Sequence, residues 1–235
     1  MSEGLRTVIL CGGKGTRAYP LTVDLPKPML PVGDRPILHH VMEIYAVQGF
    51  TSFVLAAGHL VDLVHEFAST VPASWHVDVV DTGEETDTGD RLRHCLEHVG
   101  DTFFATYGDG LGDVDAHALL GAHRSTANKA TLTTVPLPSQ YGTVDIDDDG
   151  QVQRFVEKPV LADHWINAGF FVLDRDALDL AAGANLERDV LPGLAALGVL
   201  GAYRHSGFWR SMDTHKEMVE LSRLATGTPP WLPAR

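Results

Sequence analysis

The chain has 235 residues, of which 44% are hydrophobic and 21% charged, a composition typical of a soluble globular domain. A formal net charge of −13 argues against a nucleic-acid partner, because nucleic-acid-binding surfaces are basic. No apolar stretch approaches the roughly 20 residues of a membrane helix, and the N-terminus lacks signal-peptide features, so we expect no membrane partner and a cytoplasmic location. Two cysteines, Cys11 and Cys95, exclude a disulfide framework.

Short apolar runs alternate with helical patterns through the first half of the chain, which is typical of βαβ units. The predicted strands are Thr7–Cys11, Ser52–Ala57, His76–Val80, Thr102–Tyr107 and Ala130–Val135, and the predicted helices are Pro36–Val47, Leu60–Ala68, Arg91–Val99 and Asp115–Arg124.

The second half adds a predicted hairpin, whose strands Tyr141–Ile146 and Val152–Val156 flank the turn Asp147–Gly150. The remaining predictions are strands Ala168–Leu173 and Leu200–Arg204, and helices Arg175–Leu180, Glu187–Leu197 and Thr214–Ala225. The fold class predicted is therefore α/β, with a Rossmann-like mixed, mostly parallel sheet flanked by helices in a single domain.

The glycine-rich segment Gly12–Arg17 follows the first strand, and Lys27 comes shortly after it. Glycines let backbone N–H groups approach phosphate oxygens closely, and Arg17 and Lys27 can neutralise a triphosphate. The spacing excludes a Walker A loop but matches the dinucleotide fingerprint G-x-G-x-x-A. Pro20 and the lack of an acidic residue after Ser52–Ala57 speak against NAD, yet an NAD-dependent oxidoreductase and a plain surface turn stay as alternatives.

Asp109 stands between two glycines at the end of a predicted strand, where its carboxylate can reach a ligand or Mg²⁺. A turn aspartate that bonds its own backbone is the alternative. Asp213 is a candidate partner, although its pattern alone favours an N-cap of the last helix.

Small polar groups gather in three segments of the second half, Tyr141-Gly142, Glu157-Lys158-Pro159 and Asn167-Ala168-Gly169. They suit a ligand rich in hydroxyl groups and phosphate, and they are also common turn sequences.

Taken together and in this order, these motifs resemble the sugar-1-phosphate nucleotidyltransferase (sugar-nucleotide pyrophosphorylase) family from Val8 to about Leu224. Its opening signature, GGxGTR followed by PKPM, is present as Gly12–Arg17 and Pro26–Met29. Val80–Gly83, Thr88–Leu92 and the segment from Gly207 to Thr214 are similar to the glucose-1-phosphate cytidylyltransferase branch. The relatives have a longer segment before Val80 than Ser69–Trp75.

The resemblance implies transfer of an NMP from an NTP, with CTP favoured, to glucose 1-phosphate or an analogue, with release of pyrophosphate. It implies a nucleotide-binding half (1–135), a sugar-phosphate-binding half (136–235), a Mg²⁺ cofactor and a homo-oligomer. The implied nucleotide-binding residues are Leu10, Gly12, Gly13, Gly15, Thr16, Arg17, Thr88, Gly89 and Arg91. The implied sugar-phosphate-binding residues are Tyr107, Gly142, Glu157, Lys158 and Asn167; Arg17, Lys27 and Asp109 are catalytic, and Asp109 and Asp213 hold the metal.

Three alternatives accompany this hypothesis. The same chemistry can use UTP, dTTP, GTP or ATP, and the acceptor can be another sugar or a cyclitol phosphate. A sugar-nucleotide-binding module without turnover is a different class, against which the presence of Arg17, Lys27, Asp109 and Asp213 speaks.

Overall fold

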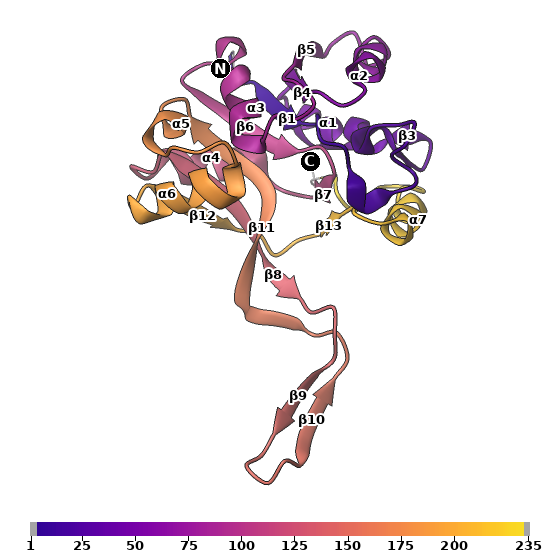
Figure 1. Cartoon of the computed structure of the whole chain (residues 1–235), viewed down its shortest axis with the longest axis vertical. Helices are drawn as coiled ribbons and strands as arrows, with labels where there is room; N and C mark the ends of the chain where they lie inside the picture. Colours follow the sequence, from indigo (N-terminus) through magenta and orange to yellow (C-terminus); the bar gives the residue numbers. More distant parts are fainter. Residues whose placement is uncertain (1–3, 233–235) are drawn as a thin grey trace.

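A computed structural model describes residues 4–232, except for the side chain of Arg17. Its centre is a seven-stranded sheet in the order β12-β8-β11-β6-β1-β4-β5 (Figure 1). The strands are β1 (Thr7–Leu10), β4 (Ser52–Ala57), β5 (His76–Asp81), β6 (Thr102–Tyr107), β8 (Ala130–Pro138), β11 (Val160–Asp174) and β12 (Leu200–Arg204). Only β11 pairs antiparallel with its neighbours in this sheet, as the described residues show, so the predicted fold class is confirmed.

Helices cover both faces of the sheet. Successive side chains of a strand point to opposite faces, so each strand contributes apolar residues to both sides. In β1, Ile9 belongs to one apolar cluster and Val8 to the other. The first cluster packs beneath helices α1 (Ile37–Ala46), α2 (Val61–Ala68), α4 (Ala116–Arg124) and α7 (His215–Leu224). The second packs beneath α3 (Thr88–His94), α5 (Ala177–Leu180) and α6 (Leu191–Ala196).

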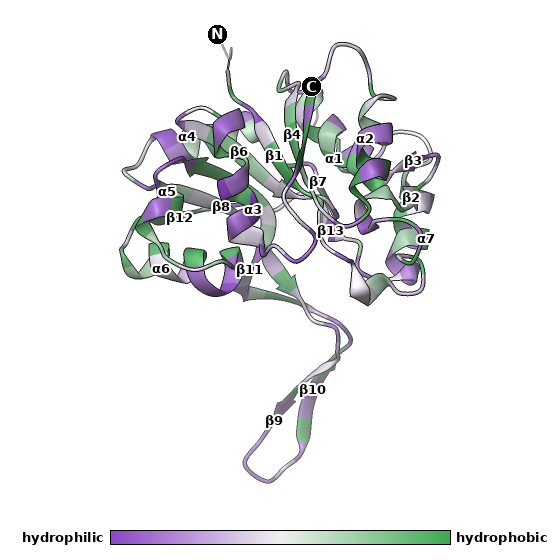
Figure 2. Ribbon diagram, turned by 45° about the horizontal axis from the view of Figure 1, so that its top comes forward, coloured by the Kyte–Doolittle hydropathy of each residue, from purple (hydrophilic) through white to green (hydrophobic). Residues whose placement is uncertain are grey.

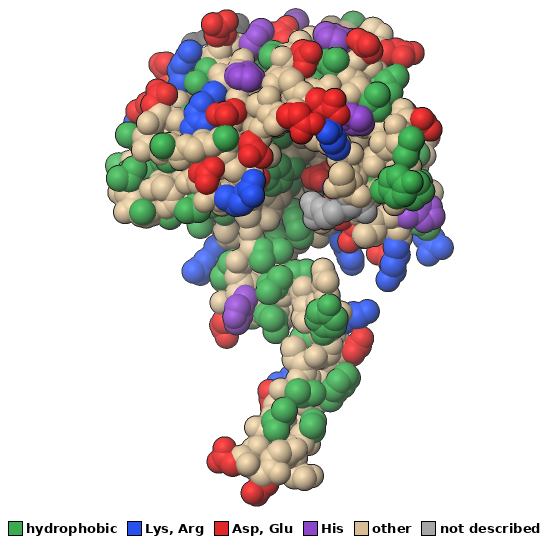
Figure 3. All heavy atoms as spheres, in the orientation of Figure 1, with side chains coloured by type: hydrophobic (Ala, Val, Ile, Leu, Met, Phe, Trp, Pro, Cys, Tyr) green, Lys and Arg blue, Asp and Glu red, His purple; other side chains and the backbone are tan. Residues whose placement is uncertain are grey.

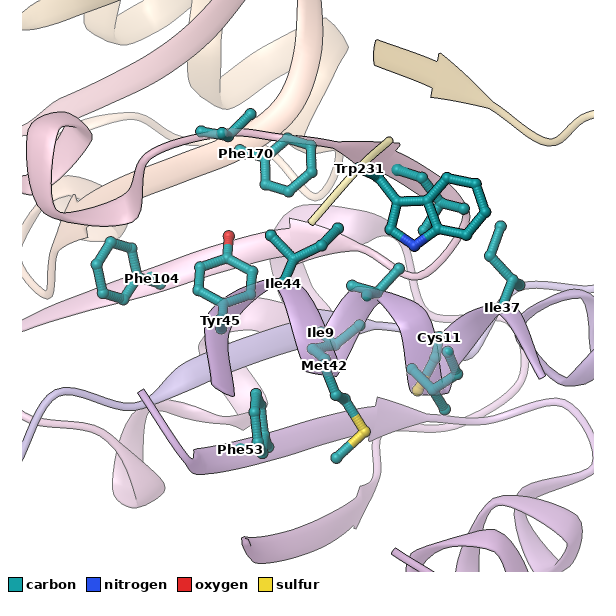
Figure 4. Close-up of a cluster of buried hydrophobic side chains, with 14 of the residues drawn as sticks. Ile9, Cys11, Ile37, Met42, Ile44, Tyr45, Phe53, Phe104, Phe170 and Trp231 are labelled. Carbon is teal, nitrogen blue, oxygen red and sulfur yellow. The ribbon is translucent and has the colours of Figure 1, made fainter. Parts of the chain in front are cut away.

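The core is built mainly from the central strands, where the apolar residues concentrate (Figure 2). Tyr45 of α1 lies between the sheet residues Phe104 and Phe170, at ring-centroid distances of 5.4 and 6.2 Å (Figure 4). Full burial of an apolar side chain such as Phe104 stabilises the fold by roughly 1.5–3 kcal/mol. Within residues 4–232, no helix has the length and apolar character needed to cross a bilayer.

Several predicted elements have other bounds than expected. The strands predicted at Ala168–Leu173 and Ala130–Val135 are parts of the longer β11 and β8, and the helix predicted from Arg175 begins at Ala177. The helix predicted from Arg91 starts at Thr88 and gives way to a 3-10 turn at Leu96–His98, so Gly89 and Arg91 both lie in α3. The helix predicted from Glu187 begins as a wider turn, η4 (Leu186–Val190), which continues into α6. Asn185 caps η4 by accepting hydrogen bonds from two of its backbone N–H groups, which explains the earlier start.

Several short elements were not predicted, because two or three residues carry no periodic signal. They are β2 (Pro31–Val32), β3 (Arg35–Pro36), β7 (Gly110–Gly112), β13 (Trp209–Ser211), and the 3-10 turns η1 (Thr16–Ala18) and η2 (Lys27–Met29). β7 and β13 pair with each other and shape the candidate site.

The predicted hairpin is confirmed and forms the end of a long arm, which projects away from the body (Figure 1). The outer parts of β8 and β11 form its stalk, and β9 (Thr143–Ile146) and β10 (Val152–Val156) form its tip. Apolar side chains lie on the surface of the arm (Figure 3), among them Ile146 and Phe155, which are 60% and 63% exposed. The central sheet takes strands from both sides of residue 135, and the functional division at that residue stays a prediction.

Candidate active site

A cavity of about 780 Å³ opens at the carboxyl ends of β1 and β6. These strands are adjacent and parallel, so the glycine-rich loop after β1 and the Gly108–Gly110 segment after β6 reach the same edge of the sheet. Twelve of the residues predicted for the site line the cavity: Leu10, Gly12, Gly13, Gly15, Thr16, Lys27, Thr88, Arg91, Tyr107, Asp109, Asn167 and Asp213.

Asp109 and Asp213 converge on the ammonium group of Lys27. The pairing of β7 with β13 brings the two aspartates together, and the Met212 amide donates to the Asp109 carbonyl oxygen over 2.9 Å. Lys27 Nζ lies 2.6 Å from Asp109 Oδ2 and 2.6 Å from Asp213 Oδ1. Lys27 is only 7% exposed, so these charges interact in a partly desolvated place, where they are stronger than at the surface.

The two aspartates fit a magnesium ion. Their oxygens point to one shared position, and Mg²⁺ commonly binds one or two carboxylates together with substrate phosphates. The described part of the chain holds no group of three or more His, Cys, Asp and Glu side chains that could bind a metal, so these two carboxylates fit an ion that completes its shell with substrate phosphate and water.

The expectation that Asp213 caps the last helix is wrong. Thr214 is the N-cap of α7, and its side chain accepts from the Glu217 backbone N–H. The Glu217 carboxylate in turn accepts from the Asp213 and Thr214 amides over 2.7 and 2.8 Å. This capping box uses the backbone of Asp213 and leaves its carboxylate directed to Lys27.

Arg91 is buried, and its guanidinium forms hydrogen bonds to several of the loops that surround the cavity. Its guanidinium donates to the carbonyl oxygens of Ala57, Gly12 and Glu84 at 3.0–3.1 Å, and to Thr82 Oγ1 at 2.5 Å. Burial lowers the pKa of Arg91. Four hydrogen bonds to the protein from this guanidinium indicate a positioning role for Arg91, in addition to its place in the cavity wall.

Glu187, which sequence reasoning missed, also lines the cavity. Its carboxylate accepts hydrogen bonds from the Tyr107 hydroxyl and, at 2.7 Å, from Thr88 Oγ1. Asn167 Nδ2 donates to the same Tyr107 oxygen at 3.3 Å. Burial and the negative charge of Glu187 raise the pKa of Tyr107, which keeps the phenol protonated. Glu187 therefore joins the predicted nucleotide and sugar sides of the cavity.

Trp209 and Lys14 also line the cavity and were not predicted. Trp209 Nε1 donates to the Ala168 carbonyl oxygen at 2.8 Å, which fixes the ring near Asn167. Lys14 pairs with the Glu85 carboxylate, and its ammonium lies 3.5 Å from Glu84 Oε1, which connects the glycine-rich loop to the loop after β5. A tryptophan in a short strand and a lysine among glycines carry no local signal for these contacts.

The remaining predicted site residues lie elsewhere. Gly142, Glu157 and Lys158 stand in the arm, where the hairpin joins its stalk, and they are not part of the cavity wall. Gly89 packs α3 against the Ala184 segment, since a Cβ at residue 89 would fall 2.8 Å from the Ala184 carbonyl oxygen. The side chain of Arg17 lies outside what the structure describes, although its neighbour Thr16 lines the cavity.

Comparisons with known proteins agree with this geometry. A family model described as nucleotidyl transferase matches residues 6–200. The chain is 37% identical over 254 residues to glucose-1-phosphate cytidylyltransferase of Salmonella typhi, with 97% of this chain and 98% of that protein covered. It is 28% identical to mannose-1-phosphate guanyltransferase beta-A of Xenopus laevis, over 98% of this chain and 68% of that protein.

Solved structures show the same fold. HddC from Yersinia pseudotuberculosis superposes with a TM-score of 0.74 and 24% identity, covering 93% of this chain and 98% of that one. The alignment with the Salmonella protein spans 254 positions against 235 residues here, so that protein contains residues without a counterpart in this chain.

Proposed function

We propose that this chain, which belongs to the nucleotidyl transferase family, transfers an NMP unit from an NTP to a sugar 1-phosphate and releases pyrophosphate. The observation that carries the proposal is the meeting of Lys27, Asp109 and Asp213 beside a glycine-rich loop in one cavity. We favour CTP and glucose 1-phosphate, because the Salmonella relative that aligns over almost its whole length bears the name of that activity.

The reaction is an in-line displacement. A phosphate oxygen of the sugar 1-phosphate forms a bond to the α-phosphorus, the bond from that phosphorus to the β-phosphate oxygen breaks, and pyrophosphate leaves. No general base is required, because the attacking phosphate is already an anion. Catalysis then consists of positioning and charge stabilisation, and alignment of the two reactants alone can supply about 7–11 kcal/mol.

Each side of the cavity has a role in this scheme. The backbone N–H groups of Gly12, Gly13 and Gly15 face the triphosphate, whose charge Arg17 and Lys27 offset. Asp109 and Asp213 hold Mg²⁺, which when bound supplies further charge neutralisation of the phosphates.

The acceptor binds on the side formed by Tyr107, Asn167 and Trp209, where the hydroxyl and amide groups can bond sugar hydroxyls. We place Glu157 and Lys158 at the acceptor as well, contributed by the arm of a second copy. Both residues are absent from the wall of their own cavity, and the arm that bears them exposes apolar side chains. The active unit is therefore a homo-oligomer, which we expect in the cytoplasm.

The test is pyrophosphate release with Mg²⁺ and glucose 1-phosphate against CTP, UTP, dTTP, GTP and ATP in turn. Release with CTP alone supports the full proposal, and release with another NTP keeps the reaction and changes the base. If glucose 1-phosphate is inactive with every NTP, the panel is repeated with other sugar and cyclitol phosphates. If no combination releases pyrophosphate and calorimetry still shows nucleotide binding, the result contradicts turnover and favours a binding module.

A further inference from the structure

The ammonium of Lys27 occupies the position that two carboxylates would give to a divalent cation. Asp109 Oδ2 and Asp213 Oδ1 each lie 2.6 Å from Lys27 Nζ. A metal ion held by both oxygens would need nearly the same point, at about 2.0–2.1 Å from each oxygen for Mg²⁺. The ammonium and the ion cannot share it, because steric overlap and like-charge repulsion both oppose them.

Lys27 is held in this place by its surroundings. It opens the short turn η2 between Pro26 and Pro28, and its side chain is 8% exposed. Gly15 of the glycine-rich loop lies directly against its stem, since a Cβ at residue 15 would fall 2.7 Å from Lys27 Cβ. The lysine that pairs with the two aspartates is therefore in contact with the loop proposed to carry the triphosphate.

We propose that the ammonium group of Lys27 occupies the metal position in the substrate-free enzyme and leaves it when a triphosphate binds. Phosphate oxygens on the glycine-rich loop attract the ammonium away from Asp109 and Asp213, and the cation takes the position that the ammonium has left. Entry of the metal is thus coupled to entry of the nucleotide, and this half-buried pair of carboxylates faces a positive charge both before and after the exchange. This inference rests on the proposed function for the nature of the nucleotide, and on the distances from Lys27 Nζ to Asp109 Oδ2 and Asp213 Oδ1 for the competition.

The experiment measures Mn²⁺ binding without nucleotide, by the loss of the free-ion EPR signal during titration. Lys27→Met and Lys27→Gln remove the ammonium and are each expected to bind Mn²⁺ about tenfold or more tightly than the wild type, within the roughly 5- to 150-fold span usual for coupled sites. Asp109→Asn added to Lys27→Met should remove this gain. Circular dichroism and thermal melts check that each variant is folded.

Lys216→Met is the matched control. It also removes one positive charge, but Lys216 is 80% exposed and its ammonium lies 3.8 Å from Glu220, outside the cavity wall. Its Mn²⁺ affinity should stay within about twofold of the wild type, because exposed charges are screened.

Unchanged or weaker Mn²⁺ affinity in both Lys27 variants overturns the inference, as does an equal gain in Lys216→Met. Either result leaves the proposed function intact if the wild-type enzyme still releases pyrophosphate. Conversely, tighter Mn²⁺ binding in an enzyme without turnover would keep the competition and reject the proposed reaction.

Discussion

Arg91 and Gly12 are in direct contact in the wall of the cavity. Arg91 Nη2 donates to the Gly12 carbonyl oxygen over 3.0 Å, and a Cβ at residue 12 would fall 2.1 Å from Arg91 Nη1. The glycine at this position therefore makes room for a buried guanidinium, in addition to any approach of its backbone to phosphate.

Gly12→Ala is expected to displace Arg91 and lower the free energy of unfolding by about 1–3 kcal/mol, the usual cost of overpacking. Gly13→Ala is the matched control, because no heavy atom lies within 4 Å of a Cβ at residue 13. Its stability should stay within about 0.5 kcal/mol of the wild type. Urea denaturation measures both, and equal loss of stability in the two variants would contradict the role assigned to Arg91.

Asp109→Asn and Asp213→Asn are each expected to reduce kcat by about 10²–10³, as removal of one preorganised charge-stabilising group does elsewhere. Each change removes one of the two negative charges that face the cation position. Pyrophosphate release at saturating substrates gives kcat. Asp62→Asn removes an exposed carboxylate of α2, outside the cavity wall and away from the arm, and should leave kcat unchanged. Near-wild-type kcat in both site variants would show that the metal lies elsewhere.

Glu187 and Tyr107 are expected to act as one unit, because the Tyr107 hydroxyl donates to the Glu187 carboxylate inside the cavity. Glu187→Gln and Tyr107→Phe should each lower kcat/KM for the sugar 1-phosphate by about tenfold, which corresponds to one lost hydrogen bond of about 1.4 kcal/mol. The double variant should lose little more than either single one. Fully multiplicative losses would mean that the two side chains act independently.

Cys11 and Cys95 are expected to be unreactive in the folded protein. Burial is the main cause that raises the pKa of each thiol from 9.0 to about 12. At pH 8 the thiolate fraction is then about 1 in 10⁴. Ellman's reagent should detect both thiols only after denaturation, and rapid reaction of the native protein would place a cysteine at the surface.

The same thiols make stability depend on alkaline pH. Their pKa values are higher in the folded chain than in the unfolded one, so their contribution to stability is complete below pH 9 and is lost as pH rises toward 12. Cys95→Ala should flatten the decline of the melting temperature between pH 9 and 11. An unchanged slope would assign the decline to other groups.

The arm is expected to hold the oligomer together. Ile146→Asp combined with Phe155→Asp places two charges on its exposed apolar surface and should shift the protein toward monomer in light scattering, with a higher KM for the sugar 1-phosphate. Leu197→Asp is the control, because Leu197 is a 57% exposed apolar residue after α6, away from the arm. An unchanged mass in the double arm variant would contradict the shared site.

The sequence by itself determined the fold class and the strands of the sheet, although β11 begins at Val160, before the predicted Ala168. Strand periodicity, glycines and turns depend on neighbours within a few residues, so the places of Gly12–Arg17 and Asp109 after their strands could be predicted. The hairpin Thr143–Val156 followed from its turn residues for the same reason, and its apolar positions are visible in the sequence, but its projection from the body is not.

Only the tertiary structure decided which of these groups meet. Lys27 and Asp213 are 186 residues apart and become partners because β13 pairs with β7 beside the end of β6, a pairing of short strands without periodic signal. Glu187 has the local pattern of a solvent-exposed helix residue, and it reaches Tyr107 because η4 packs on α3. Contacts between distant segments depend on how whole helices and strands pack. This packing is determined by many residues along the chain, so no single motif predicts it.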